Sequence, residues 1–294
     1  MSNVSLKTWL LAFRPKTLPA AIAPVMIATA MAFGDGVQHF PIACICLLAA
    51  LSIQIGTNIA NDYYDFKKGT DTIERIGPTR MTQAGLIKPS SMKLAFIVSF
   101  AIAIILGLWL IKRGGWPIAV IGILAIFSGI FYTAGPYPLG YIGLGEFFVL
   151  IFFGPVAVAG TYYVQSHEMN SAVVLAGIAP GLISVAILTV NNLRDIDSDR
   201  KAGKRTLAVR FGRSFAVYEF LFSIIAASLI PVLIYYLIED HKAILACTCL
   251  ALISIPTIKT VLTTSDGPSL NDALAKTGRL LMIYSILFSI GWIL

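Results

Sequence analysis

Long apolar segments alternate with polar loops along the whole chain. A helix needs about 20 predominantly apolar residues to cross the hydrocarbon core of a bilayer, and the segments approach that length. The pattern predicts an all-α, multi-pass integral membrane protein with nine transmembrane helices, folded as a single membrane-embedded domain over residues 1–294. The nine segments lie at residues 17–33, 41–60, 92–111, 116–134, 141–161, 171–190, 215–238, 243–263 and 279–294.

The composition supports a membrane protein. The sequence is 57% hydrophobic and 13% charged, with a mean hydropathy of +0.82, whereas soluble domains carry about 25% charged residues. The net charge of +7 could suggest a nucleic-acid partner, but the bases lie in loops between apolar segments. We therefore expect a lipid bilayer around the chain and no nucleic acid. No cleavable signal peptide is expected, because FRPKTLP precedes the first apolar segment and no A-x-A-like cleavage site separates that segment from a mature sequence.

The basic residues lie in alternate loops. Of the 22 Lys and Arg residues, 19 occur in the N-terminal segment and in the loops at 62–93, 191–214 and 259–279. The other side carries only Lys112, Arg113 and Lys242. Cytoplasmic loops of membrane proteins are enriched in Lys and Arg. We therefore expect a protein of the inner (cytoplasmic) membrane, with its N-terminus in the cytoplasm and its C-terminus outside.

A first polar cluster, NIANDYYDFKKGTDTIERIGPTR at residues 58–80, follows the second apolar segment. An acid at the bilayer centre costs roughly 2.5–3.5 kcal/mol, so these acids should lie at a helix end that faces a wet cavity. In a continuing helix, residues three and four apart share a face. The residues on that face are Asn58, Asn61, Asp62 and Asp65. Oxygen ligands without His or Cys suit Mg²⁺, although a charged loop between two helices is the simpler interpretation of this stretch alone.

A second polar cluster, NNLRDIDSDRKAGKRTLAVRFG at residues 191–212, follows the sixth segment. The i, i+4, i+8 spacing of Asn191, Asp195 and Asp199 would place them on one face of a continuing helix. The spacing of Asn61 and Asp65 recurs in Asn191 and Asp195, four segments later. An even number of segments means that both copies enter the membrane in the same direction. The sequence thus predicts a parallel repeat with two acidic faces at one membrane surface.

Basic residues follow each acidic group. Carboxylates could hold Mg²⁺ ions that bridge phosphate oxygens, while Arg and Lys neutralise the remaining charge. The two clusters together therefore predict a diphosphate site. The candidate diphosphate-binding residues are Arg75, Arg80, Arg200, Lys204 and Arg205.

The NDYYD and DIDSD segments resemble the two aspartate-rich motifs of the UbiA superfamily of intramembrane aromatic prenyltransferases. FRPKTLPAAIAPV (13–25), RIGPTRMTQAG (75–85) and the second cluster are similar to the branch that prenylates 1,4-dihydroxy-2-naphthoate in menaquinone synthesis. The resemblance covers nearly the whole chain. It implies nine helices around a cavity in which Mg²⁺ holds a polyprenyl diphosphate. The metal shell carried over from the family comprises Asn61, Asp62, Asp65, Asp195 and Asp199.

Two positions depart from the common family pattern. The third aspartate of the first motif is replaced by Gly69, and the acid falls at Asp71, an offset that the naphthoate branch shares. Asp71 is therefore kept as a further candidate metal ligand. Some relatives also have a Lys in the loop after the fourth segment, whereas residues 132–146 contain no base. Diphosphate binding would then depend on the two main clusters.

The resemblance implies transfer of a polyprenyl group to 1,4-dihydroxy-2-naphthoate, with loss of CO₂ and diphosphate. Asp62, Asp65, Asp195 and Asp199 are the candidate catalytic residues. Ring faces stabilise cations, although any one tyrosine more often anchors a helix at the interface. Glu146 is either the hydrogen-bond anchor of its loop or a functional acid. Candidates for binding the acceptor or stabilising a cation are Lys16, Asn58, Tyr64, Gln83, Tyr132, Tyr137 and Asn191.

Other functions remain open at this point. Within the same family, the chain could transfer a phytyl group to the same acceptor, or prenylate 4-hydroxybenzoate. A secondary transporter is the main alternative outside the enzymes. Transporters often have inverted repeats and ionisable residues at mid-span, whereas here the repeat is parallel and the acids lie at helix ends. The D-x2-D-G-x2-A-R core of alcohol phosphatidyltransferases is absent.

Overall fold

The computed structural model describes residues 4–70, 77 and 79–294, and within these residues it contains helices and no strands. The expected all-α membrane fold is confirmed. The helices carrying or flanking the first cluster are α1 (Leu6–Ala12), η1 (Pro15–Thr17), α2 (Pro19–Gly34), α3 (Phe40–Lys68), α4 (Pro89–Gly114) and α5 (Trp116–Phe131). The remainder are α6 (Gly145–Phe152), α7 (Pro155–Ser166), α8 (Ser171–Arg194), α9 (Ile196–Lys201), α10 (Leu207–Ile238), η2 (Lys242–Cys249), α11 (Leu250–Ile253), α12 (Ile255–Thr263) and α13 (Gly267–Ile293).

The expected count of nine transmembrane helices is not confirmed. Among the described residues, seven helices are long and apolar enough to cross a membrane. The segment containing α1, η1 and α2 adds an eighth if its two parts, bent by 57°, form one span. The remaining candidate, α5, has only 16 residues. Two of the seven spans contain more than one helix, because α7 begins at Pro155 within one and α12 begins at Ile255, next to Pro256, within the other.

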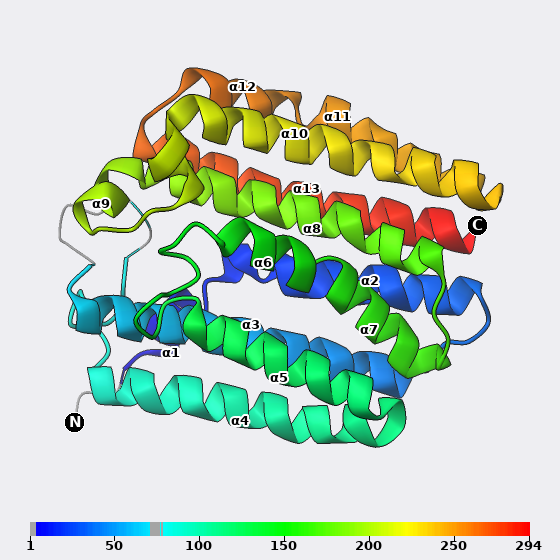
Figure 1. Cartoon of the computed structure of the whole chain (residues 1–294), viewed down its shortest axis with the longest axis horizontal. Helices are drawn as coiled ribbons and strands as arrows, with labels where there is room; N and C mark the ends of the chain where they lie inside the picture. Colours follow the sequence, from blue (N-terminus) through cyan, green and yellow to red (C-terminus); the bar gives the residue numbers. More distant parts are fainter. Residues whose placement is uncertain (1–3, 71–76, 78) are drawn as a thin grey trace.

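The helices form two groups that are joined by α2 and α7 (Figure 1). Helices α3, α4 and α5 pack together on one side, and α8, α10 and α13 pack together on the other. Each group has its own apolar core, one centred on α8 and the other between α3 and α4. We call these groups the α3 half and the α8 half.

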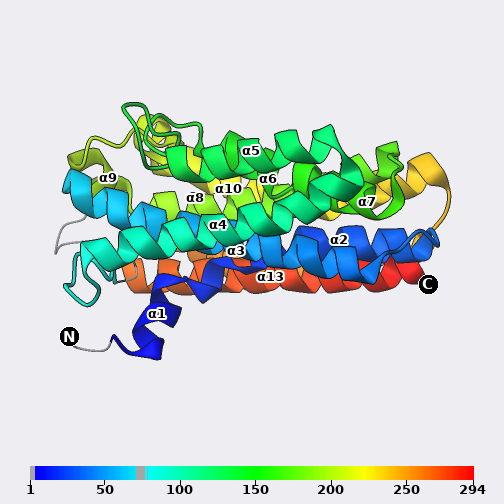
Figure 2. The same cartoon turned by 90° about the horizontal axis from the view of Figure 1, so that it is seen from below.

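Helices α3 and α8 run in the same direction, and the polar clusters at their ends lie at the same end of the bundle (Figure 1). The α1 helix lies at that end too, whereas α13 finishes at the opposite end (Figures 1 and 2). This arrangement agrees with the parallel placement of the two clusters. Gly69 ends α3 with a left-handed backbone, φ 67°, a conformation that glycine adopts without steric cost.

The second cluster is not one continuous helix as expected. Helix α8 ends at Arg194, and Asp199 lies on the short helix α9. Asp195 sits between the two helices with φ −98° and ψ 8°. Its carbonyl still accepts the N–H of Asp199 at 2.8 Å, so the helical spacing is kept across the break.

Candidate functional site

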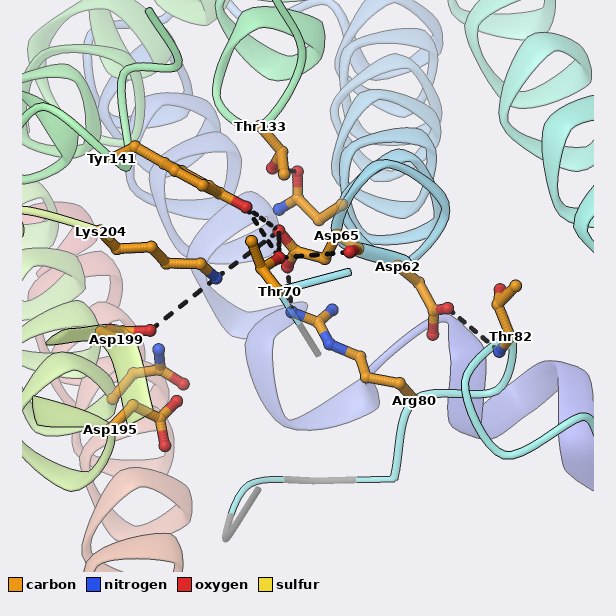
Figure 3. A network of polar contacts seen from close by, with 12 residues as sticks. Asp62, Asp65, Thr70, Arg80, Thr82, Thr133, Tyr141, Asp195, Asp199 and Lys204 are labelled. Atoms are coloured by element: carbon orange, nitrogen blue, oxygen red, sulfur yellow. Dashed lines mark hydrogen bonds and ion pairs between the residues drawn. The ribbon is translucent and has the colours of Figure 1, made fainter. Parts of the chain in front are cut away.

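The two polar clusters meet through Lys204. Its ammonium nitrogen lies 3.5 Å from Asp65 Oδ1 and 3.8 Å from Asp199 Oδ1 (Figure 3). Asp65 is near the end of α3, and Asp199 is on α9. The Asp65 side chain is 3% exposed and that of Lys204 is 13% exposed. One carboxylate from each cluster therefore faces the same positive charge.

Asp65 accepts several further hydrogen bonds. The Arg80 guanidinium donates to its Oδ2 at 2.8 Å, and the Tyr141 hydroxyl donates to its Oδ1 at 2.6 Å. The Thr70 hydroxyl lies 3.4 Å from Oδ1 and 3.0 Å from the Tyr141 oxygen. Asp65 thus joins the end of α3 to the loops on both sides of the site.

The other polar residues on this face of α3 have different partners. The two carboxylate oxygens of Asp62 accept the backbone N–H groups of Met81 and Thr82, at 2.9 and 3.1 Å. Asn61 accepts a short hydrogen bond from the Thr133 hydroxyl. Asn58 donates to the Phe13 carbonyl and the Thr17 hydroxyl, at 3.0 and 3.1 Å. Residues on one face of α3 therefore have different hydrogen-bond partners.

Asp195 is paired with the adjacent Arg194. The guanidinium contacts both carboxylate oxygens, at 2.8 and 2.6 Å. It also donates to the side-chain oxygens of Asn191, at 2.8 Å, and of Asn271 on α13, at 2.6 Å. The Arg194 side chain is fully buried. The sequence pattern predicted only a loop charge at Arg194, although its position between Asn191 and Asp195 in the motif was a usable signal.

The ring of Tyr141 contacts one ammonium group from each cluster. Lys68 and Lys204 lie 4.7 and 4.8 Å from the centre of its ring. Lys68 also donates to the carbonyls of Thr133 and Gly135, at 2.7 and 3.2 Å, and the Tyr141 carbonyl accepts the N–H of Arg205 at 2.7 Å. The loop at residues 132–146 contains no base of its own, but Lys68 and Lys204 from the two clusters lie against it. Lys68, Thr70 and Tyr141 were not expected at the site.

Several expected site residues lie elsewhere. Tyr137 is 78% exposed, and Tyr64 packs on Tyr63 and Phe96. Arg200 forms an exposed ion pair with Asp197. Lys16 and Gln83 are exposed. Asp71 and Arg75 lie outside the described residues.

Two further residues lie beside α6. The Tyr132 hydroxyl stands 3.0 Å from where a Cβ on Gly145 would be, at the first residue of this helix. Glu146 is 7% exposed and accepts a hydrogen bond of 2.7 Å from the Asn192 side chain. This bond joins the start of α6 to α8, so Glu146 serves as an anchor of its loop in this structure.

The acids fit a metal site that a substrate completes. Within the described part of the chain, no three His, Cys, Asp or Glu side chains are grouped so that they could hold a metal ion. Asp65 and Asp199 nevertheless share one cation, the Lys204 ammonium. Mg²⁺ is often bound by one or two carboxylates together with substrate phosphates. These two carboxylates match that donor set.

Comparison with known proteins supports a common ancestry. The profile of the UbiA prenyltransferase family matches residues 21–285. The 1,4-dihydroxy-2-naphthoate octaprenyltransferase of Haemophilus influenzae is 38% identical, over 99% of this chain and 97% of its own. The Escherichia coli protein of the same name is 36% identical, over 97% of this chain and 94% of its own.

A solved structure of a UbiA homologue from Archaeoglobus fulgidus, bound to GPP and Mg²⁺, has the same fold. Its TM-score is 0.70 at 16% sequence identity, with 97% of this chain and 99% of that chain covered. At this identity the similarity is one of fold. It confirms the helical architecture over nearly the full length of both chains.

Proposed function

Since the chain belongs to the UbiA prenyltransferase family, we propose that it transfers a polyprenyl group to 1,4-dihydroxy-2-naphthoate. The prenyl donor is polyprenyl diphosphate, CO₂ and diphosphate are released, and the product is demethylmenaquinol, a step in menaquinone biosynthesis. The relatives of that activity match nearly the whole chain. The single structural observation that carries the proposal is the approach of Asp65 and Asp199 to one cation.

In this proposal the two clusters form one diphosphate site. Asp65 and Asp199 would hold Mg²⁺, with Asn61 and Asp195 beside them and Asp71 as a further candidate. Arg80 and Lys204 are the leading phosphate ligands, because both already contact Asp65. Arg75, Arg200 and Arg205 remain candidates for the outer part of the diphosphate.

In this proposal, Arg80 and Lys204 exchange one negatively charged partner for another. Arg80 and Lys204 neutralise Asp65 in this structure. When bound, Mg²⁺ would neutralise phosphate oxygens and so help the diphosphate to leave with the electron pair of the C–O bond. Arg80 and Lys204 would then turn from the carboxylate to phosphate oxygens, which are strong partners for Arg and Lys.

The acceptor ring supplies the electrons for the new bond. A ring carbon attacks the allylic carbon, and the electron pair released with CO₂ restores the aromatic ring. The positive charge on the allylic carbon would lie near the ring of Tyr141, whose faces already attract two ammonium groups. Lys16, Gln83, Tyr132 and Asn191 remain candidates for orienting the acceptor. Tyr64, Tyr137 and Asn58 are weaker candidates, because their side chains are engaged or exposed elsewhere.

We also propose that the site faces the cytoplasm from the inner membrane. The end of the bundle that carries both clusters also carries most of the basic residues, as expected for a cytoplasmic face. The same chain would form one domain, since α2 and α7 pack against both groups of helices.

The test is an assay on membranes with 1,4-dihydroxy-2-naphthoate, a radiolabelled polyprenyl diphosphate and Mg²⁺. Wild type should give a lipid-soluble labelled naphthoquinone. Asp199→Asn should abolish it, whereas Asp197→Asn should not, because the Asp197 carboxylate is 90% exposed and points into solvent beside Arg200. Both variants change one acid to its amide on the same short helix.

The outcomes separate the alternatives. Product with 4-hydroxybenzoate alone would keep the reaction type and change the acceptor. Faster turnover with phytyl diphosphate would change the donor. No product with any aromatic acceptor, from folded protein, would contradict the prenyltransferase proposal and favour a transporter.

A further inference from the structure

We propose that Asp62 is a positioning residue that builds the turn carrying Arg80, and that it is not a ligand of the metal ion. The proposal rests on the diphosphate site described above. It reassigns an acid that the motif alone places in the metal shell.

Each oxygen of the Asp62 carboxylate accepts one backbone N–H. The Met81 N–H donates to Oδ2 at 2.9 Å and the Thr82 N–H donates to Oδ1 at 3.1 Å. Asp62, Met81 and Thr82 are 3%, 2% and 3% exposed. Buried N–H groups need a partner, because water cannot replace one that is lost. The carboxylate therefore has a structural task of its own.

The two N–H groups belong to a single helical turn. The Ala84 N–H donates to the Arg80 carbonyl at 2.9 Å, which is the i to i+4 bond of an α-helix. The first N–H groups of a helical turn have no partner within it, and a carboxylate at that position is favourable. Asp62 thus caps this turn from a neighbouring helix. Gly85 ends the turn with φ 69°.

Apolar packing fixes the same turn from the other side. Met81 and Ile87 are buried in the cluster that contains Ile59 and Ala60 of α3. The turn is therefore attached to α3 by the Asp62 carboxylate and by this apolar contact together. The apolar contacts at Ile59 and Ala60 precede Asp62 on α3.

Arg80 is the residue that opens the turn. It is 8% exposed and donates to Asp65 Oδ2 at 2.8 Å. Asp62 therefore holds the backbone of the turn, while Asp65, three residues later on α3, holds its first side chain. Figure 3 shows Asp62 directed toward Thr82, and Asp65 directed toward Tyr141 and Lys204.

Arg80 is therefore held in two ways, through its side chain by Asp65 and through the backbone of its turn by Asp62. Only the second contact would last through the reaction. Occupation of Asp65 by a cation would remove the side-chain support. The backbone support through Asp62 would persist, so the guanidinium would stay beside the site and bind the diphosphate. A group held in place before binding loses less entropy when it binds.

Hydrogen exchange of the purified protein in EDTA, without substrate, tests the structural part. Asp62→Asn should raise the exchange rate of the peptide covering residues 80–87, because an amide offers only one acceptor oxygen. Asp65→Asn should leave that peptide unchanged. This measurement does not depend on which reaction the protein catalyses, so its failure is distinct from failure of the proposed function. Equal protection in wild type and Asp62→Asn would overturn the proposal.

Binding measurements test the functional part. Inorganic diphosphate binding in the presence of Mg²⁺ should weaken about tenfold in Asp62→Asn and in Arg80→Ala, as for loss of a charge-assisted hydrogen bond. The double variant should be no weaker than the worse single variant, because both changes remove the same contact. Mn²⁺ binding without diphosphate should fall in Asp65→Asn and stay within about twofold of wild type in Asp62→Asn.

A second variant covers the case in which Asp62→Asn does not fold. Thr82→Pro removes one of the two N–H donors and leaves the carboxylate intact. A positioning role predicts weaker diphosphate binding in Thr82→Pro. A loss of Mn²⁺ affinity in Asp62→Asn as large as in Asp65→Asn, or additive effects in the double variant, would overturn the proposal.

Discussion

The Lys204 ammonium lies 3.5 Å from Asp65 Oδ1, and this contact joins the two polar clusters. The same ammonium is 3.8 Å from Asp199 Oδ1. A divalent cation at this position would meet the same two carboxylates. Lys204 and the metal ion should therefore compete for one place.

Lys204→Met separates the two roles of this lysine. Binding of polyprenyl diphosphate should weaken about tenfold, since one charge-assisted hydrogen bond is worth about 1.4 kcal/mol or more. Mn²⁺ binding without substrate should become tighter, because the competing ammonium is gone. Titrations of the purified variant measure both affinities. Lys201→Met, at an exposed lysine three residues earlier at the end of α9, is the control and should change neither affinity. Weaker Mn²⁺ binding in Lys204→Met would contradict the competition.

Tyr141 should contribute through its hydroxyl and through its ring. Tyr141→Phe removes the 2.6 Å hydrogen bond to Asp65 and keeps the ring, so kcat/KM for the prenyl donor should fall about tenfold. Tyr141→Leu also removes the face that Lys68 and Lys204 contact, and it should cost more. Steady-state kinetics give both values. Tyr137→Phe, in the same loop but 78% exposed, should match wild type, and equal losses at the two tyrosines would argue against a specific role for Tyr141.

Arg194 should act mainly on stability. Arg194→Met leaves the buried Asp195 carboxylate without its bidentate partner, and breaking such a buried pair costs about 3–5 kcal/mol. The Tm in detergent should fall by more than about 5 °C. Arg200→Met is the matched control, because its ion pair with Asp197 is exposed and such pairs contribute little. A similar Tm for both variants would show that the Arg194 network adds nothing measurable.

Metal binding should depend on the substrate diphosphate. Because Asp65 and Asp199 by themselves offer a cation few ligands, Mg²⁺ alone should bind weakly and raise the Tm only slightly. Mg²⁺ with inorganic diphosphate at 100 times its Kd should stabilise the protein by about 2.7 kcal/mol. Thermal unfolding with Mg²⁺, with diphosphate and with both provides the comparison. An equal rise with Mg²⁺ alone would indicate a preformed metal site, and EDTA should cancel the combined effect.

The sequence was sufficient to place the two clusters at one end of a helical bundle. Apolar segment length predicted the helices, and the even number of segments between the motifs predicted that α3 and α8 run in the same direction. The continuation of α3 through Asp65 also followed from the spacing. The break at Asp195 did not, because Asp199 keeps its helical hydrogen bond across the change in backbone direction.

The partners of the individual side chains were not predictable. Asn58, Asn61 and Asp62 lie within two turns of one helix, yet they bind the N-terminal segment, the loop after α5 and the turn after Arg80. Those contacts depend on how distant loops fold back onto α3. Tyr137 and Tyr141 are four residues apart in one glycine-rich loop, and only the loop conformation decides which ring enters the site.

The two carboxylates that face Lys204 come from different halves of the bundle, because Asp65 lies in the last turns of α3 and Asp199 lies on α9, directly after α8. Their separation is therefore set by how α2 and α7 hold the halves together. A further close contact lies between α13 and η1, where a Cβ added to Gly278 would lie 3.0 Å from the carbonyl oxygen of Lys16. Within one chain, the proposed site is built like an active site shared between two subunits, and we expect remote packing changes to inactivate it without altering any residue of the two clusters.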